Sequence, residues 1–488
     1  MKRTLTLILA FLFLLSACAS ENPEDMVGET SSADVPEGTV TEAVPEETEY
    51  APDLPDVTYE GEEFRVLYRN NASSYNNTDV FSEGLTGEVV NDAVYNRNIE
   101  LEEAYKLTLV PMESGNPVTE AKADHLANSQ NYDAMLDQMT AAFPAALQGY
   151  SYNWNDLTYV NMDDPWWDSN ISRDLTVADK LFLMAGDLTC QPTFASRFVY
   201  FNKGILENYG LADPYELVRN NQWTIAKMTE MVSAVSTDLD GDGKYTADDC
   251  LGMLTEHTDF FLSGCGIHYT ERDENGIPTV NFVNERTIAA LDAVRNMLTM
   301  ENCTQSYSQA AAGRDTSGYL HMWDFVRYEY YATGHFLFVQ NDTGAALQFA
   351  EMDPGYGVLP NPKLDETQET YYHLVDNYSC AWSLPANPRN IEMTDIIFTC
   401  WNYLSDEVVD GYYEKTLKLK KFNAPDDAEM LDIIRDTTRY EISMICNLGI
   451  SNVIANAYSS GNLMSEYAKS EKQINKLIEK TFADFIGD

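Results

Sequence analysis

The alternation of strand-like and helix-like segments is the feature that most limits how this chain can fold. Residues 62–69 are rich in β-formers and alternate in polarity, which predicts a strand, and residues 89–105 carry apolar side chains at helical spacing. The pattern continues with predicted strands at 107–110, 132–136, 181–185 and 198–201 and a predicted helix at 119–128. Alternation of this kind predicts an α/β fold in which ligand-binding loops follow the strands.

The later part of the chain is richer in helical patterns. Helices are predicted at 224–235, 284–300, 391–404, 408–420, 428–444 and 465–482, so that the C-terminal quarter is essentially helical. No repeat of about 20 to 50 residues is visible, which argues against a solenoid or a propeller. The stretch from residue 61 to residue 488 is long enough to predict two lobes.

The N-terminus has the features of an export signal. Lys2 and Arg3 precede an apolar run over residues 5–15, which is too short to cross a bilayer as a helix. The small residues Ser16 and Ala17 then precede Cys18, and this order resembles the bacterial lipobox. We expect residues 1–17 to be cleaved as a signal peptide and Cys18 to be lipidated, which would anchor the protein on the extracytoplasmic face of the cell membrane. The alternative is an ordinary signal peptide and a secreted, soluble product.

An acidic segment follows the lipidation site. Residues 21–60 contain 13 Asp or Glu, five Pro and no Lys or Arg. A segment of this composition buries too little apolar surface to fold, so residues 18–60 are predicted to form a disordered acidic tether.

Charge and cysteine content exclude several classes of partner and site. The formal net charge is −47, which makes nucleic acids and anionic lipid surfaces poor partners. Seven scattered cysteines follow Cys18, and they give neither a disulfide framework nor a zinc-binding pair.

Residues 238–249 fit the twelve-residue calcium-binding loop. Carboxylates stand at positions 1, 3, 5 and 12, and Gly243 at position 6 allows the sharp bend that brings them together. The predicted ligands are Asp238, Asp240, Asp242, Lys244 through its carbonyl, Thr246 and Asp249. Because only one such loop is present, it predicts a structural calcium ion rather than a sensor pair. An acidic surface turn without metal is the alternative.

Several short sequences, taken in their order along the chain, resemble one family of proteins. They are Asn91-Asp92-Ala93-Val94-Tyr95-Asn96-Arg97-Asn98, Trp166-Trp167-Asp168, Gly186-Asp187, Phe201-Asn202-Lys203, Asp213-Pro214-Tyr215-Glu216-Leu217-Val218, Trp223-Thr224, Gly334-His335-Phe336-Leu337-Phe338, Leu359-Pro360-Asn361-Pro362-Lys363, and Tyr412-Tyr413-Glu414. In these sequences residues 62–438 resemble the extracellular solute-binding lipoproteins of bacterial ABC importers, in the carbohydrate-type branch related to maltose-binding protein.

The resemblance implies a two-lobed periplasmic-binding-protein-like fold of type II, with crossing strands between the lobes and a helical C-terminal region. By analogy, lobe 1 would comprise residues 61–188 and 371–405, and lobe 2 residues 193–365 and 407–488. It also implies that a monomer holds a sugar or oligosaccharide in the cleft between the lobes and delivers it to the transmembrane subunits of a permease.

A sugar-binding cleft needs aromatic platforms and fixed polar side chains on loops that follow strands. The candidate ligand-binding residues are Asn70, Asn71, Gln138, Thr140, Trp167, Ser196, Arg197, Asn341, Asp342, Asp376 and Tyr378. Trp154, Trp166, Trp323 and Trp382 are further possible platforms, although tryptophan is more often a core residue.

Other functions remain open. The same fold could bind a peptide or another small solute, and a surface glycoside hydrolase would need only a suitably spaced pair of carboxylates. No nucleophile elbow, P-loop or metalloprotease motif is present, so we expect no enzymatic activity and no catalytic residues. An adhesive or structural lipoprotein is disfavoured because of the strand and helix alternation.

Overall fold

The computed structural model of the chain describes residues 50–69, 79–255, 257–347, 349, 352, 355–422 and 424–485. The described residues from Ala51 onward belong to one folded unit. Cys18, Asn70 and Asn71 lie outside the described residues, as does most of the predicted tether.

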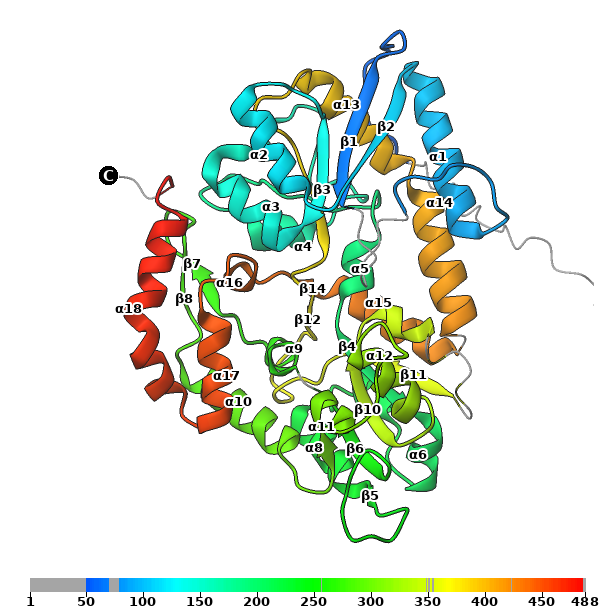
Figure 1. Cartoon of the computed structure of the whole chain (residues 1–488), viewed down its shortest axis with the longest axis vertical. Helices are drawn as coiled ribbons and strands as arrows, with labels where there is room; N and C mark the ends of the chain where they lie inside the picture. Colours follow the sequence, from blue (N-terminus) through cyan, green and yellow to red (C-terminus); the bar gives the residue numbers. More distant parts are fainter. Residues whose placement is uncertain are drawn as a thin grey trace, which may run out of the picture. The chain divides into compact units, whose positions relative to one another are not determined.

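The first sheet has four strands in the order β13-β3-β1-β2 (Figure 1). Its strands are β1 (Glu63–Arg69), β2 (Thr108–Ser114), β3 (Ala134–Gln138) and β13 (Cys380–Ser383). The strands β1, β2 and β3 are parallel, and β13 runs antiparallel to β3. Three parallel strands taken from one stretch of chain need helical crossovers, which α1 (Val89–Tyr105) and α2 (Pro117–Ala127) supply.

Aromatic side chains fill the core beside this sheet. Phe398 on α13 (Ile391–Tyr403) packs edge-on against Trp154 and Trp382, with ring centroids 5.3 and 5.2 Å apart. Phe64 of β1 joins the same group through Phe398. Residues 380–403 therefore complete a lobe whose other strands lie far earlier in the chain.

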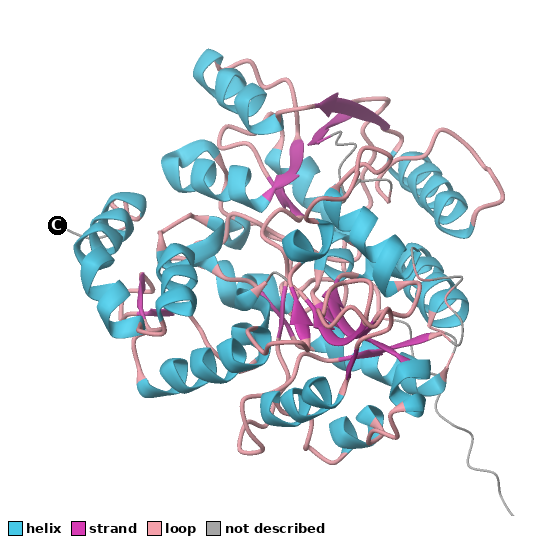
Figure 2. Cartoon of the chain, turned by 60° about the horizontal axis from the view of Figure 1, so that its bottom comes forward, coloured by secondary structure: helices cyan, strands magenta, loops and turns pink. Residues whose placement is uncertain are grey.

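The second sheet has six strands, with β11-β4-β10-β6-β5 in order and β9 paired to β6. Its strands are β4 (Phe198–Asn202), β5 (Ser236–Thr237), β6 (Cys250–Leu254), β9 (Thr304–Gln305), β10 (Phe336–Asn341) and β11 (Tyr356–Leu359). Every residue of β4, β6 and β10 is buried, as the continuous apolar runs predict. Figure 2 shows these strands with helices around them.

Helices and short strands connect these sheets. They are α3 (Met139–Ala145), η1 (Ala146–Tyr150), η2 (Trp154–Asp156), α4 (Ser169–Leu175), α5 (Gln191–Ala195), α6 (Lys203–Asn208), α7 (Pro214–Arg219), α8 (Ile225–Ala234), α9 (Thr258–Gly264), β7 (Thr270–Arg272), β8 (Pro278–Val280), α10 (Glu285–Leu298), α11 (Tyr307–Ala311), α12 (Met322–Val326), η3 (Arg327–Tyr331) and η4 (Thr343–Leu347). Many begin at a side-chain cap; for example, Thr224 accepts a hydrogen bond from the backbone N–H of Lys227 at the start of α8.

Three short extended segments cross between the sheets. Ser196 pairs with Val375 in an antiparallel bridge, and β12 (His373–Leu374) pairs in parallel with β14 (Thr438–Arg439). We call these three paired segments the crossing. Because the chain crosses back at residues 373–375, β13 can join the first sheet beside strands that were formed by residues 63–138.

The C-terminal region is helical, as predicted, but it is interrupted. It consists of α14 (Asp406–Val409), η5 (Asp410–Lys421), α15 (Pro425–Asp436), α16 (Ile442–Ile445), α17 (Ile450–Ser460) and α18 (Leu463–Thr481). The predicted helix at 428–444 is wrong. The helix α15 ends at Asp436, and Thr438 and Arg439 form β14, which joins the crossing. The predicted strand at 181–185 is also wrong: only Met184 forms a bridge there, to Trp382.

Candidate functional site

Polar side chains gather where strands of the second sheet end. Arg197 lies immediately before β4, and Asn341 and Asp342 lie at the end of β10, which is antiparallel to β4. An antiparallel pair places the start of one strand beside the end of the other. Three residues predicted to bind ligand therefore meet at one edge of this sheet.

The guanidinium of Arg197 connects this edge to the crossing. Nη2 donates to Asp376 Oδ2 at 2.9 Å, Nη1 donates to Asn341 Oδ1 at 3.1 Å, and Nη1 also lies 3.3 Å from Asp342 Oδ2. Phe260 packs against the guanidinium, whose carbon lies 5.4 Å from the ring centroid. We call Arg197, Asn341, Asp342 and Asp376 the Arg197 cluster. The carboxylates of Asp342 and Asp376 both pair with the Arg197 guanidinium, which offsets the cost of burying their charges.

Two residues that the sequence did not single out extend this cluster. Arg327 Nη1 donates to Asn341 Oδ1 at 3.4 Å, and Asn341 Nδ2 donates to the hydroxyl of Tyr307 at 3.3 Å. Burial raises the pKa of Tyr307 to about 12, which keeps its hydroxyl protonated. No sequence motif marks Arg327 or Tyr307, because each reaches the cluster from a separate helix.

One exposed tryptophan is linked to the cluster through its backbone carbonyl. Trp323 on α12 is 43% exposed, whereas the other six tryptophans are buried. The Trp323 carbonyl accepts a hydrogen bond from Arg327 Nε at 3.2 Å, and the same guanidinium reaches Asn341. Trp323 is therefore the tryptophan that has open surface for a ligand, while Trp154, Trp166 and Trp382 belong to the core.

Of the remaining predicted ligand residues, Tyr378 contacts the cluster through its backbone, whereas Gln138, Thr140 and the Ser196 side chain form no hydrogen bond with it in the described part of the chain. Gln138 is the last residue of β3 and directly precedes α3, and Thr140 lies within α3; both are half-buried. Tyr378 is 55% exposed, and its backbone N–H donates to Asp376 Oδ1. The hydroxyl of Ser196 instead donates to the Pro192 carbonyl.

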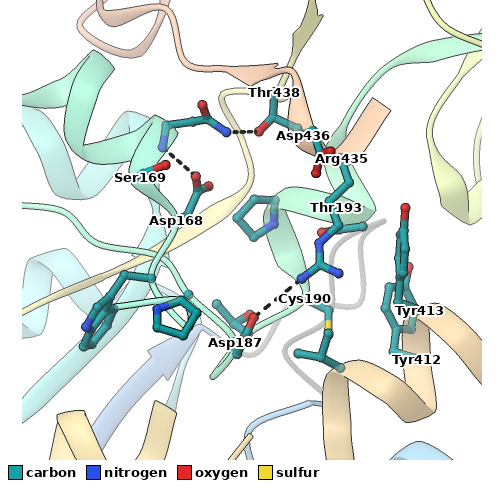
Figure 3. Close-up of a pocket in the computed structure, with 17 residues that line it drawn as sticks. Asp168, Ser169, Asp187, Cys190, Thr193, Tyr412, Tyr413, Arg435, Asp436 and Thr438 are labelled. Atoms are coloured by element: carbon teal, nitrogen blue, oxygen red, sulfur yellow. Dashed lines mark hydrogen bonds and ion pairs between the residues drawn. The ribbon is translucent and has the colours of Figure 1, made fainter. Parts of the chain in front are cut away.

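A cavity of about 390 Å³ lies elsewhere, between residues 165–193 and the C-terminal helices (Figure 3). Its lining residues are Pro165, Trp167, Asp168, Ser169, Asn170, Gly186, Asp187, Thr189, Cys190, Pro192, Thr193, Val409, Tyr412, Tyr413, Arg435, Asp436 and Thr438. We call it the Asp187 cavity. Of the predicted ligand residues, Trp167 lines it and the Arg197 cluster does not.

Strand register shows that the Asp187 cavity and the Arg197 side chain are on opposite faces of the crossing. Neighbouring residues in a strand point to opposite faces, so Ser196 faces away from Arg197. Val375 pairs with Ser196 and shares its face, as does His373 two residues earlier. Thr438 pairs with His373 and lines the cavity. The two sites are therefore separate.

Burial raises the pKa of two acidic groups of this cavity. Desolvation raises the pKa of Asp187 to about 7, against the opposing effect of Arg435, whose Nη2 lies 3.7 Å from Asp187 Oδ1. Desolvation also raises the pKa of Asp168, although Oδ2 accepts a hydrogen bond from Tyr440 and Oδ1 accepts one from the backbone N–H of Asn170. Figure 3 shows the Arg435 side chain extending towards Asp187.

The acidic loop at 238–249 has a folded-back conformation. Single carboxylate oxygens of Asp238, Asp240 and Asp242 lie within 4.8 Å of one another. The Asp238 carboxylate accepts the backbone N–H of Gly243, and that glycine has φ +79°, which a residue with a Cβ adopts only with strain. The fourth carboxylate, Asp249, is buried and accepts the N–H groups of Leu239 and Thr246. Asp249 is not part of the converging group, because both of its oxygens accept backbone N–H groups; the three clustered carboxylates are oxygen ligands of the kind that Ca²⁺ prefers.

Two further observations concern the helices and the cysteines. No helix among the described residues is long and apolar enough to span a membrane. Within the same part of the chain, none of the seven cysteines after Cys18 forms a disulfide.

Comparison with known proteins gives matches in structure only. No protein-family profile matches the chain, and no curated protein matches its sequence. An ABC substrate-binding protein from Listeria monocytogenes, solved with cycloalternan, aligns with a TM-score of 0.53 and 12% identity over 85% of this chain and 98% of that one. A cyclo/maltodextrin-binding protein solved with maltotetraose aligns with a TM-score of 0.53 and 13% identity, over 87% and 97% of the two chains.

A third solved structure aligns at similarly low sequence identity. The GacH receptor of Streptomyces glaucescens, solved without ligand and with acarbose, aligns with a TM-score of 0.52 and 13% identity over 87% of this chain and 100% of that one. Identities this low establish the fold and not the ligand. The predicted fold class is confirmed: the chain has the two-lobed α/β fold of the periplasmic-binding-protein type.

Proposed function

We propose that this protein is the extracytoplasmic receptor of an ABC importer and that it captures a sugar or oligosaccharide between its lobes. The observation that carries the proposal is the Arg197 cluster. One guanidinium binds Asp376, which precedes β13 of the first sheet, and Asn341 at the end of β10 of the second sheet. A solute bound at this point would contact side chains of the second sheet and of the segment that leads from the crossing to the first sheet.

The chemistry of the cluster suits a hydroxylated solute. Sugar hydroxyls both donate and accept hydrogen bonds, and the cluster offers carboxylate acceptors beside guanidinium and amide donors. Trp323 adds an exposed aromatic surface, which can cover the apolar C–H face of a sugar ring. The solved structures of similar fold include proteins in complex with cycloalternan and maltotetraose, which supports the same class of solute.

Binding by the mature full-length chain tests this proposal. Thermal shift and titration calorimetry in calcium would be run with mono- and oligosaccharides, short peptides and polyamines, because a solute that binds the folded state raises its stability. We expect one sugar series to raise the melting temperature. Arg197→Gln should weaken its binding by about tenfold or more, since charged hydrogen bonds are lost. Arg219→Gln, which changes an arginine that pairs with Glu216 and Glu429, should leave binding unchanged.

The other outcomes separate the alternatives. Chromatography after incubation should recover the added sugar intact, and its conversion to product would make the protein a glycoside hydrolase. A shift with peptides or polyamines alone would assign a different solute class to the same fold. Sugar binding that is equally strong in Arg197→Gln would contradict the placement of the site.

We further propose that lipid on Cys18 anchors the receptor to the membrane, where it meets the transmembrane subunits of the permease. The proposal rests on the order of small residues before Cys18 and on the acidic segment that follows. Cys18→Ser should abolish labelling by a fatty-acid analogue and release the protein from membranes. Continued labelling of that variant would contradict lipidation at this residue.

We also propose that residues 238–249 bind one structural calcium ion through Asp238, Asp240, Asp242, the carbonyl of Lys244, Thr246 and Asp249. The convergence of three carboxylates beside a glycine with positive φ supports this assignment. The ion would close the loop between β5 and β6 and add its binding energy to the stability of the second sheet.

A further inference from the structure

The Asp187 cavity is large enough for a small molecule, and nothing in the proposed receptor function uses it. Its volume of about 390 Å³ is near the lower end of ligand pockets, which run from about 300 to 1,000 Å³. Thr438 in its wall and the Arg197 side chain project from opposite faces of the crossing, as the strand register requires. A molecule in this cavity would therefore not be part of the solute bound at the Arg197 cluster.

Two charged groups of the cavity face each other without a direct hydrogen bond. Arg435 Nη2 and Asp187 Oδ1 are 3.7 Å apart, whereas a charged N–H to carboxylate hydrogen bond is about 2.7 to 2.9 Å long. The guanidinium carbon of Arg435 also lies 4.8 Å from the centroid of the Tyr413 ring, a cation–π contact that helps to hold the side chain in the cavity. A ligand hydroxyl between the two groups could accept from Arg435 and donate to Asp187.

The other lining groups limit the chemical class of the ligand. The carboxyl groups of Asp168, Asp187 and Asp436 line the cavity and disfavour anions. Burial raises the pKa of Asp168 and Asp187, which reduces the negative charge available to a cation, and the guanidinium of Arg435 opposes a cation as well. Ser169 and Thr193 add hydroxyl groups, and Trp167 with two prolines supplies apolar surface. Such a mixture of donors, acceptors and apolar wall favours a neutral molecule that carries several hydroxyl groups.

We propose that the Asp187 cavity is a second binding site, distinct from the Arg197 cluster, for a neutral polyhydroxyl compound of monosaccharide or polyol size. Asp187 accepts a hydrogen bond from one ligand hydroxyl, and Arg435 donates to a neighbouring ligand oxygen. The two side chains belong to segments far apart in sequence: Asp187 precedes α5, and Arg435 is at the end of α15. The bound molecule would bridge the first lobe to the C-terminal helices.

Titration calorimetry of the mature full-length chain with glucose, galactose, xylitol and myo-inositol tests the proposal. At pH 8, above the pKa of Asp187, we expect at least one of these probes to bind, with affinity reduced by about tenfold or more in Asp187→Asn and in Arg435→Gln, because each removes a charged hydrogen-bonding partner. Arg197→Gln should keep this binding. Because the Asp187 and Arg435 variants change one site and Arg197→Gln changes the other, failure of this proposal can be distinguished from failure of the proposed receptor function.

A third variant tests the cavity independently, in case the Asp187 or Arg435 variant fails to fold. Thr193→Leu fills part of the cavity from a different wall and leaves the Asp187 and Arg435 side chains in place, so it should also abolish binding of the probe. The proposal is overturned if none of the probes binds, if binding persists in Thr193→Leu and Arg435→Gln, or if Arg197→Gln removes it. In the last case the bound probe would occupy the Arg197 cluster instead.

Discussion

The backbone N–H of Asn361 donates a hydrogen bond to Nε2 of His373, over 3.0 Å, inside the crossing. Since Nε2 accepts, the ring proton is on Nδ1, which lies 2.8 Å from the hydroxyl of Thr437, next to β14. The Asn361 side chain in turn donates from Nδ2 to the Arg197 carbonyl at 2.7 Å. One neutral imidazole therefore connects residues beside all three segments of the crossing.

Acid should weaken this connection. Burial lowers the pKa of His373 to about 3, below the unfolded value of about 6.5, so the unfolded chain takes up the proton first as the pH falls. The stability contributed by neutral His373 is complete above about pH 6.5 and is lost progressively below it. Between pH 7 and pH 5 this loss amounts to about 2 kcal/mol.

His373→Gln should remove that part of the acid dependence while lowering stability at pH 7, because its hydrogen bonds are lost. Urea unfolding at several pH values measures both effects, and His125→Gln, on α2, is the matched control. An equal loss of stability with acid in wild type and His373→Gln would show that His373 is not the group responsible.

The contribution of Asp187 to stability should change with pH in the opposite direction to that of His373. Its folded pKa of about 7 lies above the unfolded value of about 3.9, so between these values the folded protein holds a proton that the unfolded chain has lost. Stability therefore falls as the pH rises from about 4 to about 7. Asp187→Asn should remove this fall and be more stable than wild type at pH 8 by about 1 to 3 kcal/mol. The exposed Asp163→Asn is the control, and a variant as pH-dependent as wild type would refute the assignment.

Asp395 should contribute strongly to the stability of the folded protein. Its carboxylate accepts hydrogen bonds from the backbone N–H groups of Thr158, Tyr159 and Val160, which fixes a loop against α13. Asp395→Ala would leave these donors without their acceptor and should lower the free energy of unfolding by about 3 kcal/mol. Glu392→Ala, an exposed change on the same helix, should cost well under 1 kcal/mol, and chemical denaturation compares the two.

Removal of calcium should destabilise the wild-type protein and affect one variant much less. EGTA should lower the melting temperature of the wild-type chain, because the ion binds the folded loop. Asp240→Ala should have a lower melting temperature in calcium and should lose most of the EGTA effect, while Asp315→Ala, in an exposed turn, should keep it. The metal site would be rejected by an equal EGTA shift in wild type and Asp240→Ala.

Part of the candidate site followed from sequence because strand ends can be recognised locally. Arg197 comes directly before a buried strand, and Asn341 and Asp342 come directly after another. Their mutual contact needed only the antiparallel arrangement of β4 and β10. Arg327 and Tyr307 could not be found in this way. Arg327 follows a helix, and Tyr307 follows β9, a two-residue strand without a strand pattern in the sequence, so their contacts depend on how two helices pack.

The sequence by itself determined the elements whose pattern is local: β1, α1 and β4 lie almost where their periodicity predicts, and Gly243 has the positive φ that its loop requires. Tertiary structure alone decided that residues 428–444 are split, because the two residues of β14 have no strand pattern of their own and become extended only by pairing with β12. It also decided that Asp187 and Arg435 share a cavity. The physical reason is the same in both cases: hydrophobic periodicity is set by neighbours along the chain, whereas pairing across the crossing is set by contacts between distant residues.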